Sequence, residues 1–213
     1  LVRSRGLGDV YKRQDLEVQI MATNNEIEFK QLLSKDVYDK FKYIFFEDKE
    51  PFIQINYYID TPNFTLRDHK SALRIRVKND TYEMTLKVPA DVGLMEYNHM
   101  VKHIPKTGDV ISNNSLPKDI REFVESYGIN DNELTILGAL RTARLETNYK
   151  NELLVLDRSD YFDKVDYELE FEVTDYNNGL KKFHSLLEEF NLEHTVPNNK
   201  VQRFFDYKNQ IDK

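Results

Sequence analysis

Charged residues recur at every second position in several segments of this sequence. The clearest acidic example is EIEFK at residues 26–30. In a β-strand, side chains two residues apart share a face, so Glu26, Glu28 and Lys30 point one way and the two apolar residues between them point the other. Two carboxylates about 7 Å apart along a strand can hold a divalent cation. A lysine one step further along can meet an anion that the cation also meets.

Other segments repeat this pattern with one sign of charge each. Glu168, Glu170 and Glu172 alternate with apolar residues over 166–173, and Asp157 ends another apolar run. Three neighbouring carboxylates on one face repel one another, and a bound cation relieves that repulsion. Three other segments carry basic residues at alternate positions and would together form a basic wall of Arg74, Arg76, Lys78, Lys87 and Arg144. Such a wall would attract an anion with several charges. Each segment taken alone also fits a solvated strand face, whereas together they indicate a site for a metal and a polyphosphate.

Eight segments have the alternation of a strand and must position these charges. They are residues 26–30, 52–60, 72–78, 82–88, 95–104, 139–149, 152–158 and 166–173. Helices are predicted from a Ser34 cap to residue 46, over 116–127 and over 176–190, with a short closing helix in the tail and a loop over 105–115. Hairpin connections and the need to protect strand edges favour an α+β fold: an eight-stranded antiparallel closed β-barrel with flanking helices. The helices could cover an apolar outer surface and leave the charges inside.

Composition excludes several classes of protein. The 213 residues contain no cysteine, which excludes disulfides and thiolate sites and fits a reducing cytoplasm. The net charge of −7 argues against general nucleic-acid binding, and no apolar run is long enough to span a membrane. Residues 1–14 carry four basic residues against one acidic residue without a clear period. We therefore expect residues 1–20 to be a non-native or disordered extension and 24–208 to form a single domain.

In chain order, several short segments resemble the CYTH domain of the triphosphate tunnel metalloenzymes. They are EIEFK (26–30), YYIDT (57–61), LRIR (73–76), TLK (85–87), DYELE (166–170) and KVQRF (200–204). GLMEYN (93–98) and the Leu-Asp pair at 156–157 are similar to the YjbK-like bacterial branch of that family. The resemblance extends over residues 25–207.

The resemblance implies a barrel tunnel that binds triphosphate compounds with Mg²⁺ or Mn²⁺. It implies metal ligands at Glu26, Glu28, Asp157, Glu168 and Glu170, with Glu170 and Glu172 as the alternative pair. It implies triphosphate contacts at Lys30, Arg74, Arg76, Lys87, Arg144, Lys200 and Arg203. The resemblance also implies catalytic roles for Lys87, Arg144 and Glu96, and in this role Glu96 orients water. Arg141 is the other candidate for the contact assigned to Arg144, but alternation places Arg144 on the same strand face as Thr142 and Glu146.

The first hypothesis for function is a metal-dependent triphosphatase. Inorganic tripolyphosphate is its expected substrate, because no base-recognition motif is evident; thiamine triphosphate and nucleoside triphosphates stay open. The alternatives are a class IV-type adenylate cyclase, a non-catalytic polyphosphate- or nucleotide-binding module, and a structural barrel with a solvated charged face. The expected partner is a small-molecule triphosphate, with no nucleic acid and no membrane, bound by a monomer or a homodimer.

Overall fold

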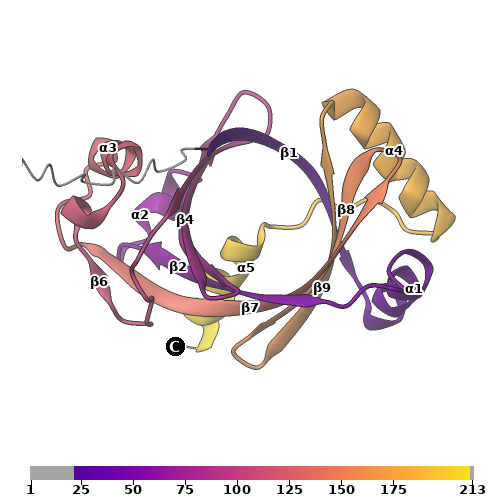
Figure 1. Cartoon of the computed structure of the whole chain (residues 1–213), viewed down its shortest axis with the longest axis horizontal. Helices are drawn as coiled ribbons and strands as arrows, with labels where there is room; N and C mark the ends of the chain where they lie inside the picture. Colours follow the sequence, from indigo (N-terminus) through magenta and orange to yellow (C-terminus); the bar gives the residue numbers. More distant parts are fainter. Residues whose placement is uncertain (1–21, 212–213) are drawn as a thin grey trace, which may run out of the picture.

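A closed barrel of antiparallel strands forms the body of the protein (Figure 1). The computed structural model describes residues 22–211, with side chains from residue 26, so the predicted extension over 1–20 lies outside the described residues. The barrel order is β2-β3-β4-β5-β1-β9-β8-β7, and β7 pairs with β2 to close it. The strands are β1 (Ala22–Leu33), β2 (Phe52–Asp60), β3 (Ala72–Lys78), β4 (Thr81–Pro89), β5 (Leu94–Met100), β7 (Leu134–Tyr149), β8 (Glu152–Tyr161) and β9 (Lys164–Val173). The predicted eight-stranded antiparallel barrel is confirmed.

Helices cover the apolar outer surface of the barrel in two groups (Figure 1). The helices are α1 (Lys35–Phe45), α2 (Thr65–Asp68), α3 (Lys118–Ser126), α4 (Tyr176–Glu189) and α5 (Lys200–Ile211). Helices α1 and α4 pack on β1, β8 and β9, where Phe183 of α4 stacks on Phe171 and Phe41 of α1 belongs to the same buried cluster. Helix α3 covers β3 and β4 through Ile120 and its neighbours. Because the apolar side chains satisfy these outer contacts, the charged side chains of the same strands must point inward.

Several elements differ from the prediction. A two-residue strand, β6 (Val110–Ile111), lies in the predicted loop over 105–115 and pairs with the first residues of β7, which therefore begins at Leu134 and not at 139. Strand β5 ends at Met100, before the predicted end at 104. Helix α2 was not predicted. These elements depend on pairing and capping partners elsewhere in the chain, so they carry no local period.

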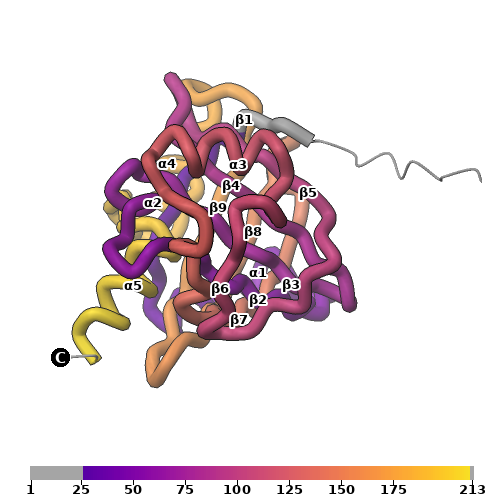
Figure 2. The backbone as a smooth tube through the Cα atoms, turned by 90° about the vertical axis from the view of Figure 1, so that its left-hand side faces the viewer, coloured from indigo at the N-terminus to yellow at the C-terminus, as the bar shows by residue number. Residues whose placement is uncertain are grey.

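Helix α5 and helix α2 lie at the same end of the barrel (Figure 2). The ring of Phe205 on α5 packs 5.3 Å from the ring of Phe64, which precedes α2. A Cβ added at Gly138 would overlap the ring of Phe204, so glycine at this point of β7 lets α5 approach the barrel closely. The predicted closing helix is therefore a twelve-residue element whose first residue, Lys200, enters the barrel.

Candidate functional site

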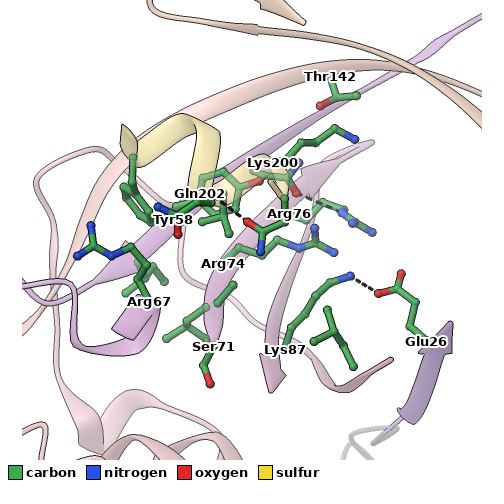
Figure 3. A pocket seen from close by; sticks show the side chains of 18 of the residues that line it. Glu26, Tyr58, Arg67, Ser71, Arg74, Arg76, Lys87, Thr142, Lys200 and Gln202 are labelled. Atoms are coloured by element: carbon green, nitrogen blue, oxygen red, sulfur yellow. Dashed lines mark hydrogen bonds and ion pairs between the residues drawn. The ribbon is translucent and has the colours of Figure 1, made fainter. Parts of the chain in front are cut away.

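The inward side chains line a cavity of about 200 Å³ inside the barrel (Figure 3). Seven strands contribute to its wall, and α2 and α5 complete one end. The charged residues in this wall are Glu26, Glu28, Lys30, Asp60, Arg67, Lys70, Arg74, Arg76, Lys87, Arg144, Glu170 and Lys200. Both signs of charge therefore meet in one small space.

Three carboxylates form an acidic cluster on β1 and β9. Glu28 lies directly opposite Glu172 in the strand register, and Glu26 lies two residues further along β1. One oxygen from each of the three lies within 4.8 Å of the others. Burial and the charge of Glu26 raise the pKa of Glu172 to about 7, while burial and the charge of Glu28 raise the pKa of Glu26. Like charges directly opposite one another destabilise a sheet, so this arrangement fits a bound cation.

The donor set of this cluster fits a hard divalent cation. Carboxylate oxygens are the ligands that Mg²⁺ and Mn²⁺ prefer. Glu172 makes no ion pair with another residue in the described range 26–211. Glu28 has Lys30 at 2.7 Å, and Glu26 has Lys87 as its ion-pair partner. Glu172 is thus the carboxylate of the cluster whose charge the protein leaves least balanced.

Gly93 fixes the position of Glu26. Gly93 has a φ of +74°, and a Cβ at this residue would overlap the backbone carbonyl oxygen of Glu26. We expect Gly93→Ala to lower the free energy of unfolding by about 3 kcal/mol, because strain and overlap add together. Gly128→Ala is the control, since Gly128 also has a positive φ but has open space around it, and its expected cost is about 1–2 kcal/mol. Equal losses in urea unfolding of the two variants would contradict this role.

A second acidic group is bound to Arg144. The guanidinium donates to both oxygens of Asp157, at 2.8 and 2.7 Å, and to Glu170 at 2.7 Å. Asp157 is completely buried, and its register partner on β7 is Arg144 itself. Although burial lowers it, the pKa of Arg144 is raised overall by Asp157 and Glu170. The arginine is therefore a fixed charge that holds two carboxylates in place.

Lys200, the first residue of α5, contacts the same buried carboxylates. It forms ion pairs with Asp157, with Glu168 at 2.9 Å and with Glu170 at 2.5 Å. These three carboxylates outweigh burial and raise the pKa of Lys200. Arg203 binds Glu168 at 2.7 Å. The second acidic group is therefore neutralised by side chains of the protein, in contrast to the cluster around Glu172.

A basic wall faces the acidic cluster across the cavity. Lys87 lies between Glu26 and Glu96 and forms an ion pair with each. Burial raises the pKa of Glu96, but the charge of Lys87 outweighs burial and lowers this pKa to about 2. Arg74 has a buried Nε atom without a hydrogen-bond partner in the described part of the chain. Arg76 donates to Asn56 at 3.3 Å, and burial together with the charge of Arg74 lowers the pKa of Arg76 to about 10. The two arginines thus carry charge that an anion in the cavity could balance.

The structure brings most of the predicted site residues together. Arg144 lies inside the barrel, whereas Arg141 lies half-exposed on the outer face near Asp160. Glu26 and Glu28 join Glu172, while Asp157, Glu168 and Glu170 lie in the ion pairs of Arg144, Lys200 and Arg203. Sequence reasoning did not identify the polar wall residues Gln54, Asn56, Thr142 and Gln202, or the basic residues Arg67 and Lys70. For Gln54, Asn56 and Thr142 the alternation within their strands was an available signal.

A model of the CYTH domain matches residues 24–205. The chain belongs to the CYTH domain family. The Bacillus subtilis (strain 168) protein named "Putative triphosphatase YjbK" is 35% identical to this CYTH chain over 190 residues, which cover 88% of this chain and 98% of that protein. The similarity therefore extends over almost the whole length of the Bacillus subtilis protein.

Solved structures show the same fold. A "putative adenylate cyclase" from Bacillus halodurans is 32% identical with a TM-score of 0.73, covering 87% of this CYTH chain and 100% of that one. HpAC1 from Hippeastrum, described as a "putative adenylyl cyclase" with a dominant triphosphatase activity, is 21% identical with a TM-score of 0.67, covering 85% and 95%. At that identity, the second likeness shows the fold alone.

Within residues 22–211, none of the helices has the length and apolarity needed to cross a membrane.

Proposed function

We propose that this CYTH chain hydrolyses triphosphate compounds with the help of a divalent metal ion. The observation that carries the proposal is the acidic cluster of Glu26, Glu28 and Glu172, because Glu26 and Glu28 line the same cavity as Arg74 and Arg76. An anion with several charges and a divalent cation would balance both sides of that cavity at once.

The acidic cluster is the proposed place for Mg²⁺ or Mn²⁺. Glu26, Glu28 and Glu172 would hold the ion, with Glu26 and Glu28 giving up their ion pairs with Lys87 and Lys30. Asp157, Glu168 and Glu170 are the alternative ligands, and each of them would have to give up an ion pair with Arg144 or Lys200. When bound, the ion would neutralise phosphate charge and act as a Lewis acid toward the phosphoryl group.

The side chains of the protein would do the rest by binding and orientation. Arg74, Arg76 and Lys87 would bind the phosphate oxygens and stabilise the charge that moves onto the leaving group. Water would attack the terminal phosphorus in line, and the bond to the bridging oxygen would break to give orthophosphate and pyrophosphate. The low pKa of Glu96 makes it an ionised acceptor that can orient the water but a weak base. The proton of the water would then pass to phosphate or solvent.

The cavity favours an inorganic substrate. Its volume of about 200 Å³ is below the roughly 300–1,000 Å³ of sites that enclose drug-sized ligands. Its aromatic wall residues, Tyr58 and Phe205, are 4% and 2% exposed and pack on neighbouring rings. A nucleobase would therefore find little open ring surface at Tyr58 and Phe205, and inorganic tripolyphosphate is the proposed substrate.

The raised pKa of Glu172 predicts a pH dependence of metal binding. Below pH 7 the Glu172 carboxyl holds a proton that a metal ion must displace, so we expect Mn²⁺ affinity to rise with pH, about tenfold per unit below 7, and to level off above it. Calorimetric titration with Mn²⁺ between pH 6 and 8 measures this. Glu172→Gln should bind the ion more weakly and without the rise through pH 7. A wild-type affinity that stays constant over this range would contradict the assignment of Glu172.

Product analysis separates hydrolysis from the alternative reaction. The name of the Bacillus halodurans relative makes adenylate cyclase the second candidate. We expect orthophosphate from tripolyphosphate, and orthophosphate without cyclic AMP from any ATP that is consumed. Formation of cyclic AMP and pyrophosphate from ATP would favour the cyclase. Tight binding of tripolyphosphate without any product would favour a binding module.

A further inference from the structure

The cavity continues past the basic wall to a corner between α2 and β3. Its lining at this corner, called the outer end below, consists of Arg67, Lys70 and Ser71 together with Gln202 of α5. In the view of Figure 3, Arg74 lies between the outer end and the ion pair of Glu26 with Lys87. A chain-like ligand that begins at the acidic cluster and passes Arg74 would therefore reach the outer end.

The charge of the outer end differs from that of the central cavity. The acidic residue nearest to it in the wall is Asp60, whose oxygens accept the backbone N–H groups of Thr61, Leu66 and Arg67 at 2.7, 2.9 and 3.0 Å. Asp60 is thus occupied in holding α2. Lys70 forms no ion pair with any residue of the described range 26–211. Arg67 is ion-paired with Asp68 at 3.0 Å. The uncompensated positive charge of the outer end is therefore that of the exposed Lys70, which could bind an anion.

Lys70 also occupies a backbone position that favours glycine. Its φ is 55°, and the turn after α2 is held by hydrogen bonds from Lys70 N to Arg67 O at 2.8 Å and from Ser71 N to Leu66 O at 2.9 Å. This is the left-handed end of a helix at which glycine is the usual residue. A lysine here costs backbone strain that glycine would not, so glycine is the substitution that removes the Lys70 side chain without straining the turn.

We propose that Lys70, with Arg67 beside it, forms an outer phosphate subsite that accepts the next phosphate group of a linear polyphosphate longer than tripolyphosphate. This inference rests on the proposed function, because the reacting end of the chain lies at the acidic cluster. Hydrolysis there releases one orthophosphate and leaves a chain shorter by one unit. Chains of four or more phosphates gain the contact with Lys70, and tripolyphosphate ends before it.

The test compares tetrapolyphosphate with tripolyphosphate in calorimetric titrations of wild-type protein and Lys70→Gly. Mn²⁺ is present, because the proposed ion holds the terminal phosphate at the acidic cluster, and phosphate released during each titration is measured so that turnover is subtracted. We expect Lys70→Gly to bind tetrapolyphosphate about tenfold more weakly, as for the loss of one charge-assisted contact, and tripolyphosphate less than about twofold more weakly. The fold is expected to persist, since glycine adopts the left-handed conformation freely.

Lys150→Gly is the matched control. Lys150 also has a positive φ, of 51°, and it lies exposed in the turn between β7 and β8, outside the lining of the cavity. The Lys150→Gly substitution should leave the affinities for tetrapolyphosphate and tripolyphosphate unchanged. Equal weakening of the two ligands by Lys70→Gly, no weakening, or no binding of either ligand by the wild type would overturn the outer subsite. Phosphate release from tripolyphosphate with Mn²⁺, measured on the same preparation, tests the proposed function separately.

Discussion

Glu28→Gln is expected to lower kcat/KM for tripolyphosphate in the presence of Mn²⁺ by about a thousandfold. Glu28 lies opposite Glu172 and shares the acidic cluster with Glu26, so its charge would be one of the three that hold the ion. Glutamine keeps the size of the side chain and an oxygen that can accept from Lys30, whose ammonium is 2.7 Å from Glu28. The loss therefore reports the charge and not the packing. Initial rates of phosphate release measure it, and calorimetry should show weaker Mn²⁺ binding in parallel.

Glu146→Gln is the control for this substitution. Glu146 shares the inward face of β7 but lies outside the acidic cluster, with its carboxylate 4.0 Å from Arg144 and partly exposed. We expect its rate to stay within about threefold of the wild type, because an exposed carboxylate contributes little to binding. If Glu28→Gln retained full activity, or if both variants lost activity equally, the acidic cluster would not be the metal site.

Arg144→Met is expected to lower the free energy of unfolding by about 3–5 kcal/mol. Arg144 makes three hydrogen bonds to Asp157 and Glu170, both almost completely buried. Methionine fills the space of the arginine stem, so the cost comes from two buried carboxylates that lose a shared cation. Lys200 contacts both carboxylates and would compensate in part. Urea unfolding followed by circular dichroism measures the change.

Arg141→Met separates this effect from the general loss of an arginine on β7. Arg141 lies three residues away on the outer face, half-exposed, with Asp160 at 3.7 Å. We expect a change within about 0.5 kcal/mol, because exposed ion pairs contribute little. Similar losses in the two variants would show that the ion pairs of Arg144 do not stabilise the barrel more than a surface pair does.

Alternation within single strands made the barrel and its charged interior predictable. The pattern of Glu26, Glu28 and Lys30 against Ile27 and Phe29 depends only on neighbours in the sequence, and so does the pattern of residues 166–173. The period of two decides which side chains share a face. It does not decide which residue of one strand lies beside which residue of the next, since register depends on packing and turns elsewhere.

Register is what the sequence did not reveal about the candidate site. It sets Glu28 opposite Glu172 and Arg144 opposite Asp157, and thereby separates the weakly balanced acidic cluster from the carboxylates that Arg144 and Lys200 neutralise. From the sequence alone, Glu26 and Glu28 were grouped with Asp157, Glu168 and Glu170, and Glu172 was only an alternative. The outer end was missed for a similar reason, because α2 forms only where the Asp60 carboxylate accepts its backbone N–H groups.

Metal-dependent hydrolysis is tested most directly by phosphate release from tripolyphosphate with the whole chain. It is measured with Mg²⁺, with Mn²⁺ and with a chelator in place of added metal, in protein shown by circular dichroism to be folded. A metal-dependent triphosphatase should release phosphate only with the divalent ion and should release none with the chelator. Release that continues unchanged in the chelator, or no release with either ion, would contradict a metal-dependent triphosphatase in this barrel.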